Sequence, residues 1–248
     1  MRPGIEAVAF DLDGTLYPNY SLNGRLIPFA LKNLRLLLAF GKARKILHSE
    51  RNGPAQTGSR ATGPDTGPAG GGRAGFYDEQ AALVADIVGA EPEIIRDKIE
   101  NLIYRGWERH FKKIKLYPGV LETLDAFRRA GLKLGLLSDF PPEAKLEYLG
   151  IGACWDAVLC SEQIGSLKPK SAPFAELARA LDLEPGKILY VGNSFRYDVI
   201  GAKKAGMSAA LINRTLFSTG AGGKGGERGF RADFVFYDYR QLYNYMLS

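Results

Sequence analysis

The sequence contains few cysteines and histidines, and this scarcity excludes several kinds of site. Among 248 residues there are two cysteines, Cys154 and Cys160, and two histidines, His48 and His110. Two cysteines cannot build a disulfide framework, so a reducing cytoplasm is the expected setting. None of these four residues has the spacing of a zinc site, and neither histidine lies in a sequence that suggests a Ser-His-Asp triad.

Long apolar runs and dense clusters of one charge are missing as well. The first apolar stretch stops at Asp11, so we expect no signal peptide. The formal net charge is +6, but no run of five lysines or arginines occurs, and no aromatic residues alternate with basic ones. A solvated basic surface therefore explains the charge better than nucleic-acid binding does, and we expect no nucleic-acid partner.

The sequence does contain a regular alternation of short apolar strands and amphipathic helices. Apolar runs predict a first strand that ends at Phe10 and later strands at 132–137, 157–160, 187–191, 208–212 and 233–236. Helical patterns lie between them at 119–130, 142–149, 171–181 and 198–205. Strand, helix and strand joined by short connections are typical of a parallel sheet covered on both faces. The predicted fold class is therefore α/β, with a doubly wound parallel sheet.

A helical insertion interrupts this pattern after the first strand. Residues 1–17 and 116–248 are predicted to form the α/β core, and residues 18–115 the insertion. Apolar periodicity within the insertion predicts helices at about 26–42, 77–89 and 92–113. The insertion is therefore expected to fold as a small helical domain.

Three segments outside the sheet carry further expectations. The basic amphipathic helix at 26–42 could lie on a membrane surface, but packing on neighbouring helices is favoured because wide apolar faces usually pack. Segments 52–75 and 219–229 are rich in glycine and poor in large apolar side chains, so both are predicted to be flexible. The segment 219–229 also lacks the Gly-Lys-Ser/Thr ending of a phosphate-binding P-loop.

Two aspartates follow the first strand directly. The apolar run ends in Asp11-Leu12-Asp13-Gly14-Thr15, which puts both carboxylates at the carboxyl end of the strand, where open α/β sheets bind ligands. One carboxylate can attack phosphorus while the other moves a proton. A Mg²⁺ ion would relieve their repulsion and bind a phosphate. The structural alternative is a plain turn, because aspartate and glycine both favour turns.

Polar side chains also follow later predicted strands. Ser138 ends one strand, and its hydroxyl can bind a phosphate oxygen. Lys168 can bring a positive charge to a phosphate, although Lys170 is an alternative by charge alone. Asn193 and Asp198 flank the turn after another strand and offer oxygen ligands for Mg²⁺. Each has a plain alternative as a cap, a turn residue or a solvated lysine, but the four clusters in this order form a specific pattern.

The four clusters resemble the motifs of the haloacid dehalogenase superfamily, specifically its phosphatase branch. The resemblance covers the predicted α/β core, and many members carry a helical cap where this chain has its insertion. It implies that Asp11 attacks phosphorus to form an aspartyl-phosphate. It also implies that Asp13 protonates the leaving oxygen and then activates water, and that Lys168 and Ser138 hold the phosphoryl group.

The resemblance further implies a Mg²⁺ cofactor. Its ligands would be the Asp11 side chain, the Asp13 carbonyl and an oxygen from the fourth cluster, either Asn193 or Asp198. Dehalogenases of the superfamily lack the second aspartate, so Asp13 favours phosphate chemistry. The fourth motif usually begins Gly-Asp, and Gly192-Asn193 therefore removes one negative charge. Such a charge acting on a partner about 4 Å away is worth roughly 4 kcal/mol at an effective dielectric near 20, before desolvation is subtracted.

The expected function is a Mg²⁺-dependent phosphatase acting on a small phosphorylated metabolite. The alternative is a binding module that kept the fold but lost a competent metal site, and Asn193 is the residue that supports it.

Overall fold

A parallel β-sheet forms the centre of the molecule. The computed structural model describes residues 2–19, 31–49, 73–106, 111–112, 114–213 and 229–248. Within these residues six strands pair in the order β3-β2-β1-β4-β5-β6, all in parallel. They are β1 (Ala7–Phe10), β2 (Lys133–Ser138), β3 (Ala157–Cys160), β4 (Ile188–Gly192), β5 (Ser208–Ile212) and β6 (Phe234–Phe236). Every predicted strand is present, and the predicted α/β fold is confirmed.

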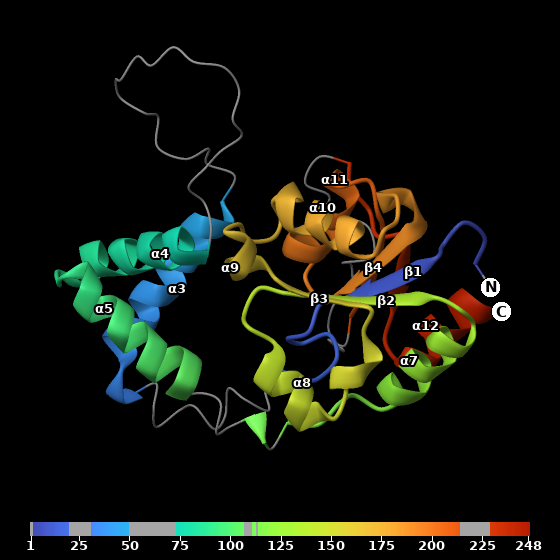
Figure 1. Ribbon diagram of the computed structural model, residues 1–248, viewed down its shortest axis with the longest axis horizontal. Helices are drawn as coiled ribbons and strands as arrows, with labels where there is room; N and C mark the ends of the chain where they lie inside the picture. The colour runs from blue at the N-terminus through green and yellow to red at the C-terminus, as the bar shows by residue number, and fades with distance from the viewer. Residues whose placement is uncertain (1, 20–30, 50–72, 107–110, 113, 214–228) are drawn as a thin grey trace, which may run out of the picture.

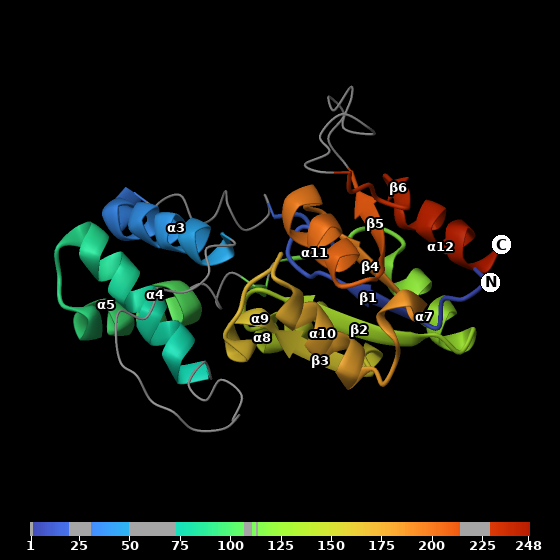
Figure 2. The same cartoon turned by 90° about the horizontal axis from the view of Figure 1, so that it is seen from above.

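Helices cover both faces of the sheet (Figures 1 and 2). Side chains of β1 alternate between the faces, as in any strand. Val8 and Phe10 pack in one apolar cluster with α7 (Val120–Arg129) and α12 (Tyr239–Leu247). Ala7 and Ala9 pack in a second cluster with α10 (Ser171–Ala180) and α11 (Ile200–Lys204). The helices and helical turns of the core are α7 (Val120–Arg129), α8 (Glu143–Leu149), η2 (Gly152–Cys154), α9 (Ser161–Ile164), α10 (Ser171–Ala180), η3 (Pro185–Lys187), η4 (Phe195–Val199), α11 (Ile200–Lys204) and α12 (Tyr239–Leu247).

The described part of the insertion consists of helices packed on one another beside the core (Figure 1). They are α3 (Leu34–His48), α4 (Arg73–Val88), α5 (Pro92–Lys98) and the π-helical segment η1 (Ile99–Tyr104). Phe40, Val84, Ile95 and Ile103 are among the residues of their shared apolar cluster. Helix α3 therefore buries one face against neighbouring helices, as the sequence favours.

Several predicted boundaries differ from the structure. Residues 73–75 belong to α4, so the predicted flexibility of 52–75 is wrong for its last three residues, and 52–72 lies outside the described residues. The predicted helix at 198–205 begins earlier, as the π-helical turn η4, because the Ser194 hydroxyl accepts a hydrogen bond from the N–H of Tyr197. Helices α9 and α12 were not predicted. The segment 219–229 is described only at its last residue, and 26–30 is outside the described residues.

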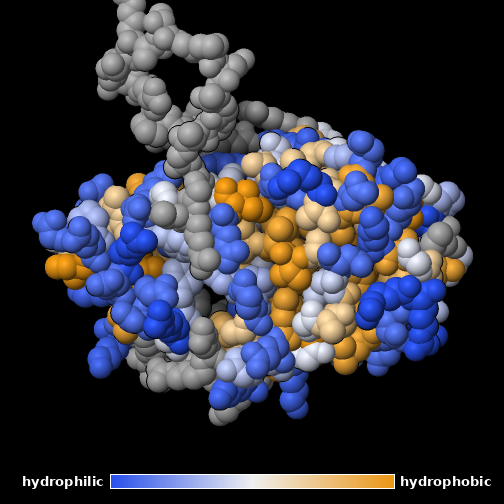
Figure 3. Space-filling view, in the orientation of Figure 1, coloured by the Kyte–Doolittle hydropathy of each residue, from blue (hydrophilic) through white to orange (hydrophobic). Residues whose placement is uncertain are grey.

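On the face shown in Figure 3, an apolar band lies over the sheet edge formed by β3, between more hydrophilic areas. Val158 of β3 is among the exposed large apolar side chains. None of the described helices is long and apolar enough to cross a lipid bilayer.

Candidate active site

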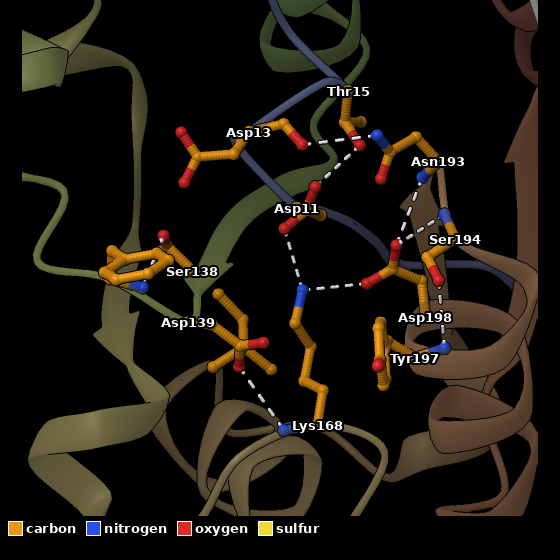
Figure 4. Close-up of polar contacts among 12 residues, drawn as sticks. Asp11, Asp13, Thr15, Ser138, Asp139, Lys168, Asn193, Ser194, Tyr197 and Asp198 are labelled. Atoms are coloured by element: carbon orange, nitrogen blue, oxygen red, sulfur yellow. Dashed lines mark hydrogen bonds and ion pairs between the residues drawn. The ribbon is translucent and has the colours of Figure 1, made fainter. Parts of the chain in front are cut away.

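The sheet brings the four polar clusters to one edge. Phe10, the last residue of β1, pairs with Leu136 of β2 on one side and Val191 of β4 on the other. Asp11 follows immediately, and its N–H donates to the carbonyl of Val191 at 2.9 Å. Ser138 ends β2 and Asn193 follows β4, so the side chains after three neighbouring strands meet at the carboxyl edge of the sheet (Figure 4). Open α/β sheets bind ligands at this edge.

Lys168 connects the first and fourth clusters. Its Nζ lies 2.7 Å from Oδ1 of Asp11 and 2.8 Å from Oδ1 of Asp198, and its side chain is only 3% exposed. The hydroxyl of Thr15 donates to the other oxygen of Asp11 at 2.8 Å. Both oxygens of Asp11 are therefore fixed. Lys168, not Lys170, is the lysine at the Asp11 carboxylate.

This buried group of charges carries a negative excess, because one ammonium faces the two carboxylates of Asp11 and Asp198. Burial, together with the charges of Asp198 and Asp13, outweighs Lys168 and raises the pKa of Asp11 to about 7. Burial acts against the Lys168 ammonium, but the two carboxylates outweigh burial and raise the pKa of Lys168 well above its usual value. A further cation beside Asp11 would balance the charge.

Asp13 has a separate set of partners. Its carboxylate points away from Asp11 and Lys168 (Figure 4). The Nζ of Lys145, in α8, lies 2.6 and 2.8 Å from its two oxygens, and the hydroxyl of Tyr17 donates to one of them. Burial acts to raise the pKa of Asp13, but Lys145 and the Tyr17 hydroxyl outweigh burial and hold it below the usual value.

Sequence reasoning missed Lys145. A lysine in an amphipathic helix ordinarily faces solvent, and no local spacing connects Lys145 with Asp13, more than a hundred residues earlier.

The turn after β4 places Asn193 and Asp198 in different roles. The side-chain nitrogen of Asn193 donates a hydrogen bond to the backbone carbonyl of Asp13 at 3.3 Å. One oxygen of Asp198 accepts the backbone N–H groups of Asn193 and Ser194, at 3.1 and 2.9 Å, while its other oxygen contacts Lys168. Asp198 therefore holds the turn and the lysine, and Asn193 is the residue beside the Asp13 carbonyl.

Two glycines make these close approaches possible. A Cβ on Gly14, which has a positive φ of 87°, would lie 2.0 Å from the side-chain nitrogen of Asn193. A Cβ on Gly192 would lie 2.3 Å from the side chain of Asp198. Neither distance is compatible with a side chain, so both positions require glycine in this arrangement.

The oxygen atoms at this edge suit a Mg²⁺ ion. The Asp11 carboxylate and the Asp13 carbonyl come from the end of β1 and offer the hard oxygen donors that Mg²⁺ prefers. Asn193 follows the neighbouring strand β4; its side-chain nitrogen faces the Asp13 carbonyl, and rotation of the amide would present its oxygen there instead. In the described part of the chain, no group of three or more His, Cys, Asp or Glu side chains could hold a metal. The candidate set contains a backbone carbonyl and an amide, and the negative excess around Asp11 favours a cation there, so these residues fit the ion.

One polar contact between the helical insertion and the core lies beside the site and joins four side chains, here called the junction cluster: Arg44, Tyr77, Tyr104 and Glu162. The guanidinium of Arg44 in α3 pairs with the carboxylate of Glu162 in α9, whose side chain has no exposed surface. The hydroxyls of Tyr77 and Tyr104 donate to the other Glu162 oxygen at 3.3 and 3.0 Å. Three side chains of the insertion thus converge on one core carboxylate.

His48 adds a direct contact between the insertion and the loop that carries Lys168. Its Nδ1 lies 2.5 Å from the carbonyl of Lys168, and its ring packs against that of Tyr197, with centroids 4.4 Å apart and the planes tilted by 31°. Burial lowers the pKa of His48 more than Asp139 raises it. The insertion therefore contacts the segment that carries Lys168.

Comparisons with known proteins found matches that cover most of the chain. A family model described as haloacid dehalogenase-like hydrolase matches residues 5–206. A glyceraldehyde 3-phosphate phosphatase of Methanopyrus kandleri is 30% identical, over 85% of this chain and 84% of that protein. A phosphoglycolate phosphatase of Salmonella choleraesuis is 29% identical, over 82% of this chain and 79% of that protein. A crystal structure of a HAD phosphatase from Thermococcus onnurineus has a similar fold, with a TM-score of 0.58, 21% identity and 98% of each chain covered.

Proposed function

The chain belongs to the haloacid dehalogenase-like hydrolases, and from that premise we propose that it is a Mg²⁺-dependent phosphatase that hydrolyses a small phosphomonoester through an aspartyl-phosphate. The observation that carries the proposal is Asp11, which is buried at the end of β1 with Lys168 at 2.7 Å and a second aspartate, Asp13, two residues further on. Relatives named as phosphatases support the phosphate chemistry.

In the first step an oxygen of Asp11 attacks phosphorus, and the bond from phosphorus to the leaving alcohol breaks. The Thr15 hydroxyl and the Lys168 ammonium fix the attacking carboxylate, so little reorganisation is needed. Asp13 must carry a proton at this point, although Lys145 and Tyr17 favour its carboxylate form, and it gives that proton to the leaving oxygen. Ser138 and Lys168 would hold oxygens of the phosphoryl group, on which charge accumulates.

In the second step water attacks the phosphorus of the aspartyl-phosphate. Asp13, now a carboxylate, takes a proton from that water, and the bond from phosphorus to Asp11 breaks. Inorganic phosphate leaves and Asp11 is regenerated. Lys145 and Tyr17 favour the carboxylate form of Asp13 that this step requires.

Asp11, the Asp13 carbonyl and Asn193 would hold the Mg²⁺ ion. A bound Mg²⁺ would supply positive charge that stabilises the charge on the transferred phosphoryl oxygens. Asp198 would not bind the ion itself but would hold Lys168 and the backbone of Asn193 in place.

The purified protein should therefore release phosphate from members of a phosphomonoester panel when Mg²⁺ is present. The panel begins with glyceraldehyde 3-phosphate and phosphoglycolate, the compounds named for its relatives. We expect Asp11→Asn to reduce kcat by at least about a thousandfold, because the nucleophile is lost. No phosphate release by the wild-type protein from any member would overturn the proposal.

The second candidate is a binding module with a weakened metal site, and Asn193 is the observation that favours it. Mg²⁺ titrated into the wild-type protein and into Asn193→Asp separates the two candidates. Absence of Mg²⁺ binding in both proteins, together with no phosphate release, would favour the binding module.

A further inference from the structure

Lys145 is a buried lysine in a helix that otherwise turns polar side chains to solvent. In α8, Glu143 and Glu147 are exposed, whereas the side chain of Lys145 is 6% exposed. Burial of an ammonium is costly unless it is paired and hydrogen-bonded. The position of Lys145 is therefore determined by its partner, and that partner is Asp13.

The ammonium of Lys145 contacts both carboxylate oxygens of Asp13. The Nζ of Lys145 lies 2.6 Å from Oδ1 and 2.8 Å from Oδ2 of the carboxylate. The same ammonium lies 5.2 Å from the ring centre of Phe111 and 5.7 Å from that of Phe140. Two aromatic faces thus flank the cation and limit its movement.

A second donor holds the same carboxylate from within its own loop. The hydroxyl of Tyr17 donates to Oδ1 of Asp13, and the Tyr17 side chain is fully buried. A free aspartate would sample several χ1 rotamers, but two anchors on different elements select one of them. Lys168 does not share this task, because its ammonium contacts Asp11 and Asp198.

We propose that Lys145 is a positioning residue, which holds the Asp13 carboxyl group in the orientation needed to pass a proton to the leaving oxygen when it is protonated, and to take one from water when it is ionised. This inference rests on the proposed function and deepens it. The protein then uses one lysine for each aspartate: Lys168 for the nucleophile and Lys145 for the proton-transfer residue.

The test compares two substrates for Lys145→Met. Nitrophenyl phosphate has a leaving group that needs little protonation, whereas an alkyl phosphate needs a well-placed acid. We expect kcat/KM for the alkyl phosphate to fall roughly 10- to 100-fold, which is part of the roughly 10²- to 10⁴-fold that general acid catalysis contributes. We expect kcat/KM for nitrophenyl phosphate to change by less than about threefold. Lys145→Arg should recover part of the loss, because arginine can also contact both carboxylate oxygens.

Two controls separate positioning from a merely structural role. Lys187→Met removes a lysine that pairs with Glu6 far from the site, and should leave both substrates unaffected. Lys145→Met in an Asp13→Asn background should add little to the loss caused by Asp13→Asn alone, because the two residues act as one unit. If Lys145→Met does not fold, as judged by circular dichroism, Lys145→Gln and Lys145→Arg carry the same comparison.

Equal losses for the two substrates, or no loss for either, would overturn the positioning role while leaving the phosphatase activity in place. An inactive wild-type protein would instead overturn the proposed function itself, so the two failures can be told apart.

Discussion

At the scale of single residues, Asn193 is where the site departs from the usual pattern of its family. Its amide lies beside the Asp13 carbonyl, in a space that Gly14 leaves open. The neutral amide lowers the number of negative charges around the candidate Mg²⁺ ligands by one. The metal affinity of the protein should therefore respond to the charge at this position.

Asn193→Asp should lower the Mg²⁺ concentration needed for half-maximal activity. A unit charge at about 4 Å is worth roughly 4 kcal/mol at an effective dielectric near 20, and desolvation removes much of it. We expect about a tenfold gain in affinity, which corresponds to about 1.4 kcal/mol. Activity measured across a Mg²⁺ titration checks this, with Asn193→Ala as the control that should lose affinity. An unchanged midpoint in Asn193→Asp would show that this residue does not face the ion.

Gly192→Ala should distort the turn after β4, because the added Cβ would clash with Asp198. The added Cβ would lie 2.3 Å from the Asp198 side chain, so Asp198 would have to leave Lys168 or the backbone of the turn. We expect kcat to fall by at least about tenfold, because misplacement by about 1 Å is costly in an active site. Gly186→Ala is the matched control, since nothing lies within 4 Å of a Cβ there. Equal activity of the two variants would contradict the role assigned to Asp198.

At the scale of elements, the sequence predicts the strands of the sheet well and some of the helices less well. All strands were predictable because short apolar runs alternate with amphipathic helices. Helix α12 was not predicted, although Asp238 accepts a hydrogen bond from the N–H of Gln241 and so gives it a regular N-terminal cap. The residues of the site also fall into two groups, those that local sequence predicts and those that it does not. Asp11 and Asp13 follow from local spacing, whereas Lys145 and Glu162 join the site through tertiary packing that no local pattern encodes.

The contact between α3 and α9 makes the clearest prediction at this scale. Arg44→Met leaves the carboxylate of Glu162 buried without its cation, and loss of one partner of a buried pair costs about 3–5 kcal/mol. Urea unfolding at pH 9 should show a loss of this size. The double variant Arg44→Met/Glu162→Gln should recover part of it, because the unpaired charge is removed. A loss below about 1 kcal/mol in the single variant would mean that the pair is solvated.

The same pair predicts a pH dependence. Burial raises the pKa of Glu162 from 4.5 to about 7, although Arg44 opposes the shift. The folded protein then keeps a proton that the unfolded chain has released, so the contribution of Glu162 to stability falls as the pH rises between these two values. Without Arg44 the pKa of Glu162 rises further, so the loss of stability with rising pH continues to a higher pH. The destabilisation by Arg44→Met should thus be larger at pH 9 than at pH 6, and urea unfolding at both values checks this. A penalty independent of pH would contradict it.

At the scale of the whole molecule, the helical insertion and the core meet next to the catalytic edge. The junction cluster connects α3, α4 and η1 with α9, and His48 contacts the carbonyl of Lys168. The insertion therefore contacts the segment that carries Lys168, the lysine proposed to hold the phosphoryl group. The division into a core at 1–17 and 116–248 and a separate insertion domain at 18–115 stays a prediction, and the contacts above are where the two parts would act together.

Removal of the metal tests the cofactor of the assembled protein. Chelation with EDTA should reduce phosphate release to background, and added Mg²⁺ should restore it, because the negative excess around Asp11 then regains its balancing cation. Circular dichroism before and after chelation should be unchanged. Full activity in excess chelator would contradict the assignment of Mg²⁺.

The most direct test of the central claim is to look for the phosphoryl group on Asp11. The protein is mixed with Mg²⁺ and a phosphomonoester that it hydrolyses, and the reaction is quenched in acid. The protein is then digested, and the peptide that carries Asp11 is examined by mass spectrometry. The account predicts a phosphorylated Asp11 in the wild-type protein, more of it in Asp13→Asn where water activation is slowed, and none in Asp11→Asn. Phosphate release that persists in Asp11→Asn would contradict it.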